Sequence, residues 1–145
     1  MLPAMTASGD LPVGIHPAGW AELEERFGKG SDSRVRGLAR LRHLYELATR
    51  TGALRRFLVF GSFVSAAAEP RDVDVVLIMD AAFRLEEAPR ESQTLFSHAD
   101  ADARFGASVF WIRESMLSED EMREFLETWQ TKRDRTIRGI VEIKP

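Results

Sequence analysis

The residues best suited to chemistry lie in two short clusters, Gly61-Ser62 and Asp72-Val73-Asp74. Alternate side chains of a β-strand share a face, so Asp72 and Asp74 are expected to project together. A divalent cation between two such carboxylates removes their repulsion, and Mg²⁺ prefers oxygen ligands, with substrate phosphates completing its shell. Two metal ions there could activate an attacking oxygen and neutralise a leaving pyrophosphate. The pair predicts a site for Mg²⁺ or Mn²⁺, with Asp72 and Asp74 as metal ligands and catalytic residues.

The Gly61-Ser62 cluster is suited to binding phosphate. A glycine at the end of a strand lets the backbone approach a ligand closely. Ser62 is expected to begin a short helix, where free N–H groups favour an anion, and its hydroxyl can donate one more hydrogen bond. Taken alone, Gly-Ser is also typical of an ordinary turn, and Asp-x-Asp of a solvated strand edge or a salt-bridged face. The two clusters together favour a site for a nucleoside triphosphate.

The elements that must position these clusters follow from the hydrophobic pattern. Residues 56–60 predict a short buried strand that ends at Gly61. Residues 62–68 predict a helix of one or two turns, and residues 72–79 predict a second strand that is buried at its far end. This strand–helix–strand order would bring the glycine–serine turn beside the two carboxylates.

The rest of the chain continues the alternation of helices and strands. We expect the following further elements: a helix from Pro17 that ends at Gly28 and Gly30, a helix from Ser31 or Asp32 to Gly52 with an apolar stripe of Val35, Leu38, Leu41, Tyr45 and Ala48, a helix over 90–103 anchored by Leu95 and Phe96, a strand over 108–112, a helix after the capping-box pattern Ser118-x-x-Glu121, and a strand over 137–143. Such an order favours an α/β fold in which helices pack on a mixed sheet.

Length and composition limit the function classes. At 145 residues the chain is the size of one domain, and we expect residues 1–15 to form an extended arm of it. The absence of cysteine excludes disulfides, thiol catalysis and cysteine-ligated metal sites. No apolar run approaches the length of a membrane span, and the N-terminus lacks the pattern of a signal peptide. We therefore expect a cytoplasmic protein.

Charge is distributed unevenly along the chain. The net charge of −3 argues against an avid non-specific DNA-binding protein. Residues 29–56 nevertheless hold eight Lys and Arg against two Asp and Glu, whereas residues 69–127 are predominantly acidic. Solvated helix faces account for such a pattern. The alternative is a basic surface beside an acidic site, which would suit a polyanion held near metal ions.

The joint motif resembles a known family. An apolar residue, Gly and Ser, then nine to thirteen residues, then Asp-apolar-Asp-apolar is the signature of the DNA polymerase β-like nucleotidyltransferase superfamily. Here it is represented by Phe60-Gly61-Ser62 and Asp72-Val73-Asp74-Val75. The chain is also similar to small bacterial members of that superfamily, some of them linked to toxin–antitoxin or phage-defence loci. The segments that carry this wider similarity are Leu11–His16, Trp20–Gly28, Gly61–Val64, Phe125–Gln130 and Gly139–Ile143.

The resemblance implies a nucleotidyltransferase fold with a small mixed sheet, a requirement for Mg²⁺, and transfer of a nucleotidyl group from a nucleoside triphosphate to a hydroxyl of a protein, RNA or small molecule. It implies that Gly61 and Ser62 bind the triphosphate and that Asp72 and Asp74 bind metal. A partner protein encoded nearby is a further implication.

One departure from the family pattern bears on activity. Active members usually carry a third carboxylate on a later strand, and the strand available here, residues 106–112, has no Asp or Glu. Glu114 lies just past it and is expected to fall beyond the site. Loss of one carboxylate should weaken the metal on the attacking side most. Two alternatives to an active enzyme therefore stay open, an inactive interaction module such as an antitoxin-like partner, and a nucleotide sensor.

Other residues have structural interpretations that we favour over functional ones. Lys132, Arg133 and Arg135 predict a solvated turn, with contact to phosphate or an acidic partner as the alternative. His98 is expected on a helix surface rather than as a general base. The three tryptophans are expected to pack in the core rather than to stack on a base. RNA binding by the arginines of residues 34–56 is the alternative to a solvated face.

Overall fold

The computed structural model describes all 145 residues and contains a five-stranded mixed sheet. Its strands are β1 (Ile15–Ala18), β2 (Leu54–Phe60), β3 (Val73–Met79), β4 (Ala107–Arg113) and β5 (Ile140–Ile143). They lie in the order β1-β5-β2-β3-β4. β1 is parallel to β5 and β3 to β4, whereas β2 is antiparallel to both of its neighbours. The predicted α/β class with a mixed sheet is confirmed.

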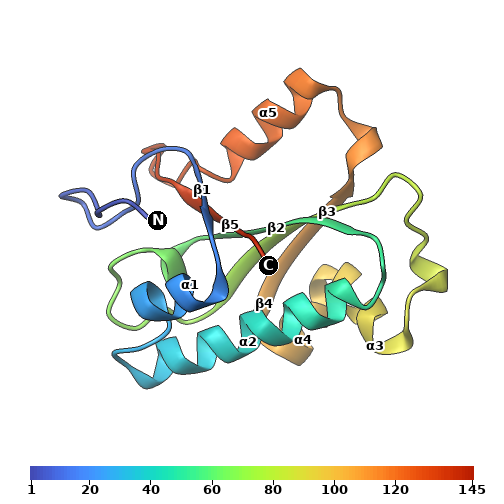
Figure 1. Cartoon of the computed structure of the whole chain (residues 1–145), viewed down its shortest axis with the longest axis horizontal. Coiled ribbons are helices and arrows are strands. Elements are labelled where there is room, and N and C mark those ends of the chain that lie inside the picture. The colour runs from blue at the N-terminus through green and yellow to red at the C-terminus, as the bar shows by residue number, and fades with distance from the viewer.

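Five helices pack on this sheet, on both of its faces. They are α1 (Trp20–Phe27), α2 (Asp32–Thr49), α3 (Arg90–Gln93), α4 (His98–Phe105) and α5 (Glu119–Thr128). Figure 1 shows α1 to α4 on one side of the sheet and α5 alone on the other. The face under α5 is therefore the less covered one.

Strand alternation divides the core between these two faces. On β3, Val73 and Val75 belong to the larger cluster, which is built with α1, α2 and α4. Val76 and Ile78 belong to a smaller cluster, which includes Leu126 of α5. Because alternate residues share a face, Asp74 lies on the α5 side of the sheet. The prediction that Asp74 projects away from Val73 and Val75 is confirmed.

The ends of the longer helices follow their sequence signals. Ser31 caps α2 by accepting a hydrogen bond from the Arg34 N–H. Ser118 and Glu121 form the predicted capping box of α5. The apolar stripe of α2 is rotated from the predicted one, because Leu44 and Leu47 are buried while Val35 is 56% exposed. The helical repeat predicts that one face of α2 is buried but does not fix which neighbouring positions belong to that face. The contact with the sheet decides this, and it buries Leu44 and Leu47.

Three other predictions need correction. Pro17 lies in β1, not at the start of a helix; β1 is an edge strand, where a residue without an N–H is tolerated. The expected helix over 90–103 is broken by a 3₁₀ turn over Thr94–Phe96, and Ser97 then caps α4. The final strand begins at Ile140, because residue 137 pairs instead with Thr131 in a hairpin.

The first fourteen residues contain no helix or strand, but they are anchored to the body of the fold. Leu2 and Leu11 are buried in the larger core cluster, and Asp10 is 6% exposed. None of the helices combines the length and the apolar composition that a membrane span requires.

Candidate functional site

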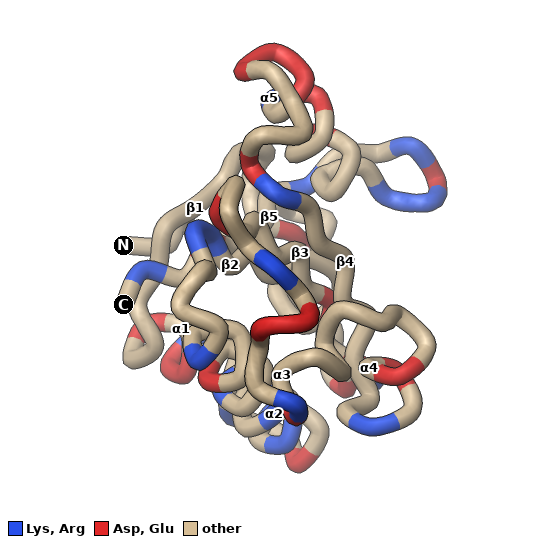
Figure 2. The backbone as a smooth tube through the Cα atoms, turned by 90° about the vertical axis from the view of Figure 1, so that its right-hand side faces the viewer, with Lys and Arg blue, Asp and Glu red and all other residues tan.

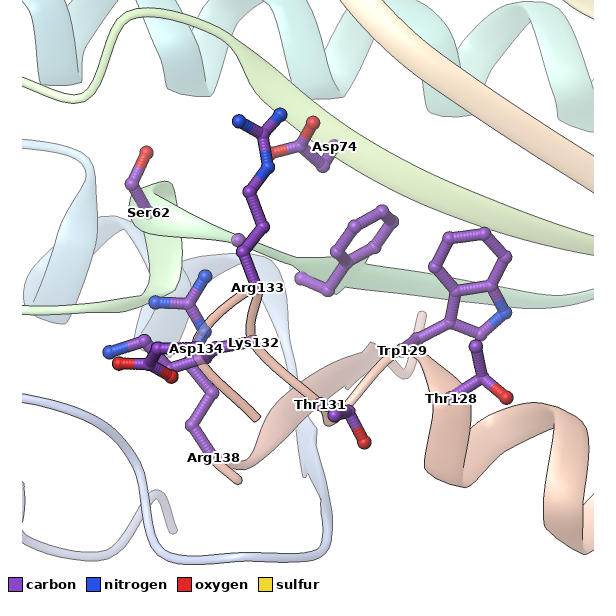
Figure 3. Close-up of a pocket in the computed structure, with 11 residues that line it drawn as sticks. Ser62, Asp74, Thr128, Trp129, Thr131, Lys132, Arg133, Asp134 and Arg138 are labelled. Atoms are coloured by element: carbon purple, nitrogen blue, oxygen red, sulfur yellow. The ribbon is translucent and has the colours of Figure 1, made fainter. Parts of the chain in front are cut away.

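An open cleft of about 640 Å³ lies on the α5 side of the sheet. It is bounded by the end of β2, the start of β3, the end of α5 and the hairpin that follows α5 (Figure 3). Its lining residues are Phe60, Gly61, Ser62, Asp74, Thr128, Trp129, Thr131, Lys132, Arg133, Asp134 and Arg138. Three of the four predicted site residues, Gly61, Ser62 and Asp74, are therefore brought together in one cleft.

Gly61 and Asp74 are in direct contact. The pairing of β2 with β3 places Phe60 opposite Asp74, so that the chain turns at Gly61 immediately beside the carboxylate. Gly61 has a φ of 82°, which favours glycine. A β-carbon at Gly61 would lie 3.0 Å from Cγ of Asp74, and closer still to Oδ2. Glycine is thus required here both by the backbone conformation and by the approach of the carboxylate.

The electrostatic environment of Asp74 disfavours its charged form. Burial raises the pKa of the carboxyl group, and the nearby charge of Asp72 raises it further. A hydrogen bond with Ser108 and the positive charges of Arg138 and Arg133 act in the opposite direction but do not cancel the rise in pKa. A cation arriving beside Asp74 would relieve this cost.

Asp72 lies differently from the sequence expectation. It precedes β3 by one residue, its side chain is exposed, and it is not among the residues that line the cleft. Its charge acts on Asp74 and therefore lies near it. Strand pairing begins only at Val73, opposite Ala107 of β4, so Asp72 lies outside the strand and outside the lining of the cleft.

The turn that carries Ser62 is shorter than predicted. A 3₁₀ turn over Ser62–Val64 replaces the helix expected over 62–68. Three residues are too few to build an appreciable helix dipole, so the turn itself adds little positive potential. Ser62 is half-buried, and its hydroxyl lies at the edge of the cleft (Figure 3).

Arg34 of α2 stabilises this turn through hydrogen bonds to its backbone. Its guanidinium is 7% exposed, and it donates to the carbonyl oxygens of Phe63 at 2.8 Å, Ser65 at 2.7 Å and Ala67 at 2.5 Å. A fourth hydrogen bond, 3.0 Å long, reaches the carbonyl of Phe27 in α1. No carboxylate pairs with this arginine, and burial lowers its pKa. The planar guanidinium fixes the backbone that positions Gly61 and Ser62.

Positive charge in the cleft comes from the hairpin of residues 131–138, which we call the cationic hairpin. Lys132, Arg133 and Arg138 line the cleft from this hairpin. Figure 2 shows it projecting from the body of the molecule, with basic residues on both sides of an acidic one at its tip. The prediction of a solvated turn is wrong for Lys132, which is half-buried and pairs with Asp10. Arg133 is exposed in the turn, as predicted, and also lines the cleft.

Two cations of the hairpin, Lys132 and Arg138, form ion pairs with the same buried carboxylate. Asp10 lies 3.3 Å from Nζ of Lys132 and 3.3 Å from Nη1 of Arg138. One negative charge thus faces two positive ones. Arg133 forms no ion pair, and its side chain reaches across the cleft toward Asp74 (Figure 3). Sequence reasoning could not find this arrangement, because Asp10 and Arg138 are separated by most of the chain.

The other end of the cleft is aromatic. The ring centroid of Trp129 lies 4.9 Å from that of Phe60 and 4.6 Å from that of Phe110 on β4. Trp129 is half-buried: it packs on the sheet and also lines the cleft. The cleft therefore has a charged end at Ser62 and Asp74 and an apolar wall at Trp129.

The cleft offers few carboxylates to a metal ion, because Asp74 and Asp134 are the only acidic side chains in its lining. No group of three or more His, Cys, Asp or Glu side chains is arranged to hold a metal. On β4, the residue paired with Asp74 is Ser108, so that a hydroxyl occupies the place where a third carboxylate would face the site. Asp72 and Asp74 could together supply the protein ligands of one ion. They do not supply enough ligands for two.

The remaining sequence candidates lie outside the cleft. His98 is exposed and its ring packs on Phe110, with centroids 5.0 Å apart. Trp20 stacks edge-on with Tyr45 of α2. The Trp111 indole donates to the carbonyl of Phe96. These contacts support the structural interpretations of these side chains.

Comparison with known proteins assigns the chain to a family without assigning a function. A family model described as a family of unknown function (DUF6932) matches residues 3–144, almost the full length. No curated protein and no solved structure matches the chain.

Proposed function

We propose that this chain, which belongs to the DUF6932 family of unknown function, binds a magnesium-loaded nucleoside triphosphate in the cleft between Gly61 and the cationic hairpin. The contact between Gly61 and Asp74 is the observation that carries the proposal. It places an electrostatically strained carboxylate beside a turn without a side chain, at the charged end of an open cleft. Polyphosphate and a divalent cation are the ligands whose chemistry suits both features.

Each side chain of the cleft has a separate task in such a complex. The bare backbone at Gly61 lets a phosphate approach, and the Ser62 hydroxyl donates a hydrogen bond to it. Asp74, with Asp72 from the residue before β3, would ligate the magnesium ion, which on binding would neutralise phosphate charge and polarise the phosphorus–oxygen bond. Trp129 offers an aromatic face on which the base can stack.

We propose nucleotidyl transfer as the reaction that this arrangement serves. The oxygen of an acceptor hydroxyl on a protein, RNA or small molecule bonds to the α-phosphorus, and the bond from that phosphorus to the bridging oxygen breaks. Pyrophosphate leaves with the electron pair, and the hydroxyl proton passes to solvent or to a carboxylate. Arg133 and Arg138, which line the cleft, would stabilise the charge that develops on the departing pyrophosphate.

A second candidate function is nucleotide binding without turnover, as a nucleotide sensor or an antitoxin-like partner protein. Ser108 is the observation that favours it, because the strand next to Asp74 offers a hydroxyl where a proton-accepting carboxylate would be needed. A protein of this kind would retain the affinity for nucleotide but would lack the general base that accepts the proton of the attacking hydroxyl.

Calorimetric titration tests the binding proposal. Mg–ATP, Mg–GTP, Mg–CTP and Mg–UTP are titrated into the wild type, Asp74→Asn and Asp72→Asn, with Asp102→Asn as a control on the exposed surface of α4. We expect at least one nucleotide to bind, at least tenfold more weakly to Asp74→Asn, and unchanged to Asp102→Asn. Equal heats from all four proteins, or no heat from any, would reject the site.

Label transfer separates the two candidate functions. Nucleotides labelled at the α-phosphate are incubated with the protein and with candidate RNA and protein acceptors. Covalent label that is lost in Asp74→Asn would establish transfer and eliminate the non-catalytic alternative. Tight binding without label in any acceptor would favour the sensor or partner protein.

A further inference from the structure

We propose that the cationic hairpin binds the phosphate chain directly, so that the cleft holds a polyphosphate even without a divalent cation. The inference rests on the proposed function, since it concerns the same cleft. It adds which positive side chains bind the phosphate. The cleft contains three cationic side chains, Lys132, Arg133 and Arg138, against the carboxylates of Asp74 and Asp134.

One of those two carboxylates is committed elsewhere. Asp134 accepts hydrogen bonds from the backbone N–H of Thr136 at 3.0 Å and from its hydroxyl at 2.5 Å. These bonds lower its pKa and close the tip of the hairpin. Asp134 therefore shapes the turn and does not pair with a cation of the cleft.

The fixed cations carry excess positive charge. Asp10 is a single carboxylate shared by Lys132 and Arg138, and it lies behind them in the fold. It positions both side chains and neutralises only one of the two. Because these groups are partly buried, their field is screened less by salt than that of fully exposed charges.

Arg133 is the cation that is free to bind a ligand. It has no ion-pair partner, it is exposed, and its guanidinium reaches toward Asp74 (Figure 3). A guanidinium can donate two parallel hydrogen bonds to one phosphate, which makes arginine well suited to phosphate recognition. A phosphate held between Ser62 and Arg133 would be hydrogen-bonded on two sides.

The shortage of carboxylates points in the same direction. Ser108, and not a third carboxylate, is paired with Asp74, and no group of three acidic or histidine side chains is arranged to hold divalent cations. The three side-chain cations of the hairpin, only one of which Asp10 neutralises, would supply neutralisation that a second ion would otherwise provide. The hairpin cations should therefore hold the phosphate chain when no metal ion is present, and a magnesium ion bound at Asp74 would add to that affinity.

The hairpin itself supplies a matched control. Arg135 lies two residues from Arg133 on the same hairpin, is exposed, and does not line the cleft. Substitution of either arginine by glutamine changes the net charge by the same amount. A difference between Arg133→Gln and Arg135→Gln therefore reports position in the cleft and not overall charge.

The experiment is a titration of inorganic tripolyphosphate in EDTA into the wild type, Arg133→Gln and Arg135→Gln, with melting temperatures to confirm folding. We expect the wild type to bind, Arg133→Gln to bind at least tenfold more weakly, and Arg135→Gln to stay within twofold of wild type. An equal loss in both variants would overturn the inference, since only net charge would matter. Absence of wild-type binding in EDTA would also overturn the inference. If the same protein then bound Mg–ATP in buffer without EDTA, the proposed function would stand without the inference.

Discussion

The backbone of Gly61 lies directly against the carboxylate of Asp74, so that a β-carbon at residue 61 would lie 3.0 Å from the Asp74 Cγ. The two residues come from neighbouring strands and meet because Phe60 pairs with Asp74 across the sheet. A glycine and an acid that were singled out separately in the sequence thus form one structural unit.

Gly61→Ala is expected to destabilise the fold and to abolish nucleotide binding. The positive φ alone costs about 1–2 kcal/mol for a residue with a side chain, and the new methyl group must also displace the Asp74 carboxylate. Gly52→Ala is the control, since Gly52 has a φ of 72° with no atom close to its β-carbon position. Chemical denaturation should show a larger loss for Gly61→Ala than for Gly52→Ala; equal losses would mean that the contact with Asp74 is unimportant.

Asp74→Asn is expected to stabilise the free protein at neutral pH while it weakens magnesium–nucleotide binding at least tenfold. Burial raises the pKa of Asp74, so folding is penalised when the group is charged. The stability that the neutral acid contributes is fully present below its unfolded pKa, about 4, and is lost as pH rises through the folded pKa. The variant should therefore melt a few degrees above the wild type at pH 7, with the difference vanishing near pH 4. A lower melting temperature for the variant at pH 7 would be inconsistent with this assignment.

Arg34→Lys is expected to loosen the Ser62 turn although it keeps the charge. A lysine ammonium cannot reproduce the planar set of hydrogen bonds that the guanidinium donates to four carbonyl oxygens. The free energy of unfolding should therefore fall by about 2–4 kcal/mol. Arg36→Lys, two residues away and exposed on the same helix, should change stability by less than about 0.5 kcal/mol. Amide hydrogen exchange at residues 62–67 should accelerate in Arg34→Lys alone. Unchanged protection there would show that the turn holds its shape without the guanidinium.

Glu142→Gln is expected to weaken the sheet. Glu142 is 6% exposed and receives two hydrogen bonds from Arg56, at 3.0 and 2.7 Å. Burial would raise its pKa, but these bonds and one from Lys144 outweigh it and hold the pKa below its ordinary value.

The stability linked to Glu142 is present above its unfolded pKa and is lost as pH falls through the folded pKa. The variant should lose about 3 kcal/mol at pH 7, and the difference from wild type should shrink in acid. Urea denaturation at pH 7 and pH 3 measures both values. A pH-independent difference would point to packing in place of the ion pair.

Local signals predicted the strands at the site well. Residues 56–60 and 72–79 contain short, partly β-branched apolar runs that favour buried strands, and β2 and β3 lie there. The capping box at Ser118 likewise placed α5. These features depend on neighbours along the chain, which a single sequence contains.

Features that depend on distant pairing escaped prediction. β1 forms because it pairs with β5 at the other end of the chain, and the four residues of β1 contain no signal that predicts this pairing. The cationic hairpin faces the cleft because Asp10 holds Lys132 and Arg138. Asp72, predicted to stand beside Asp74 on the strand, lies just outside it because strand pairing begins at Val73.

Mg–ATP binding in the cleft is tested most directly by NMR mapping on the uniformly labelled protein. We expect the amide shifts to concentrate at Gly61, Ser62, Asp74 and residues 131–138, and to require at least tenfold more Mg–ATP in Asp74→Asn. Shifts confined to the other face of the sheet, for example at the surface hollow formed by Trp20, Arg42 and Tyr45, would contradict it, as would a spectrum that Mg–ATP leaves unchanged.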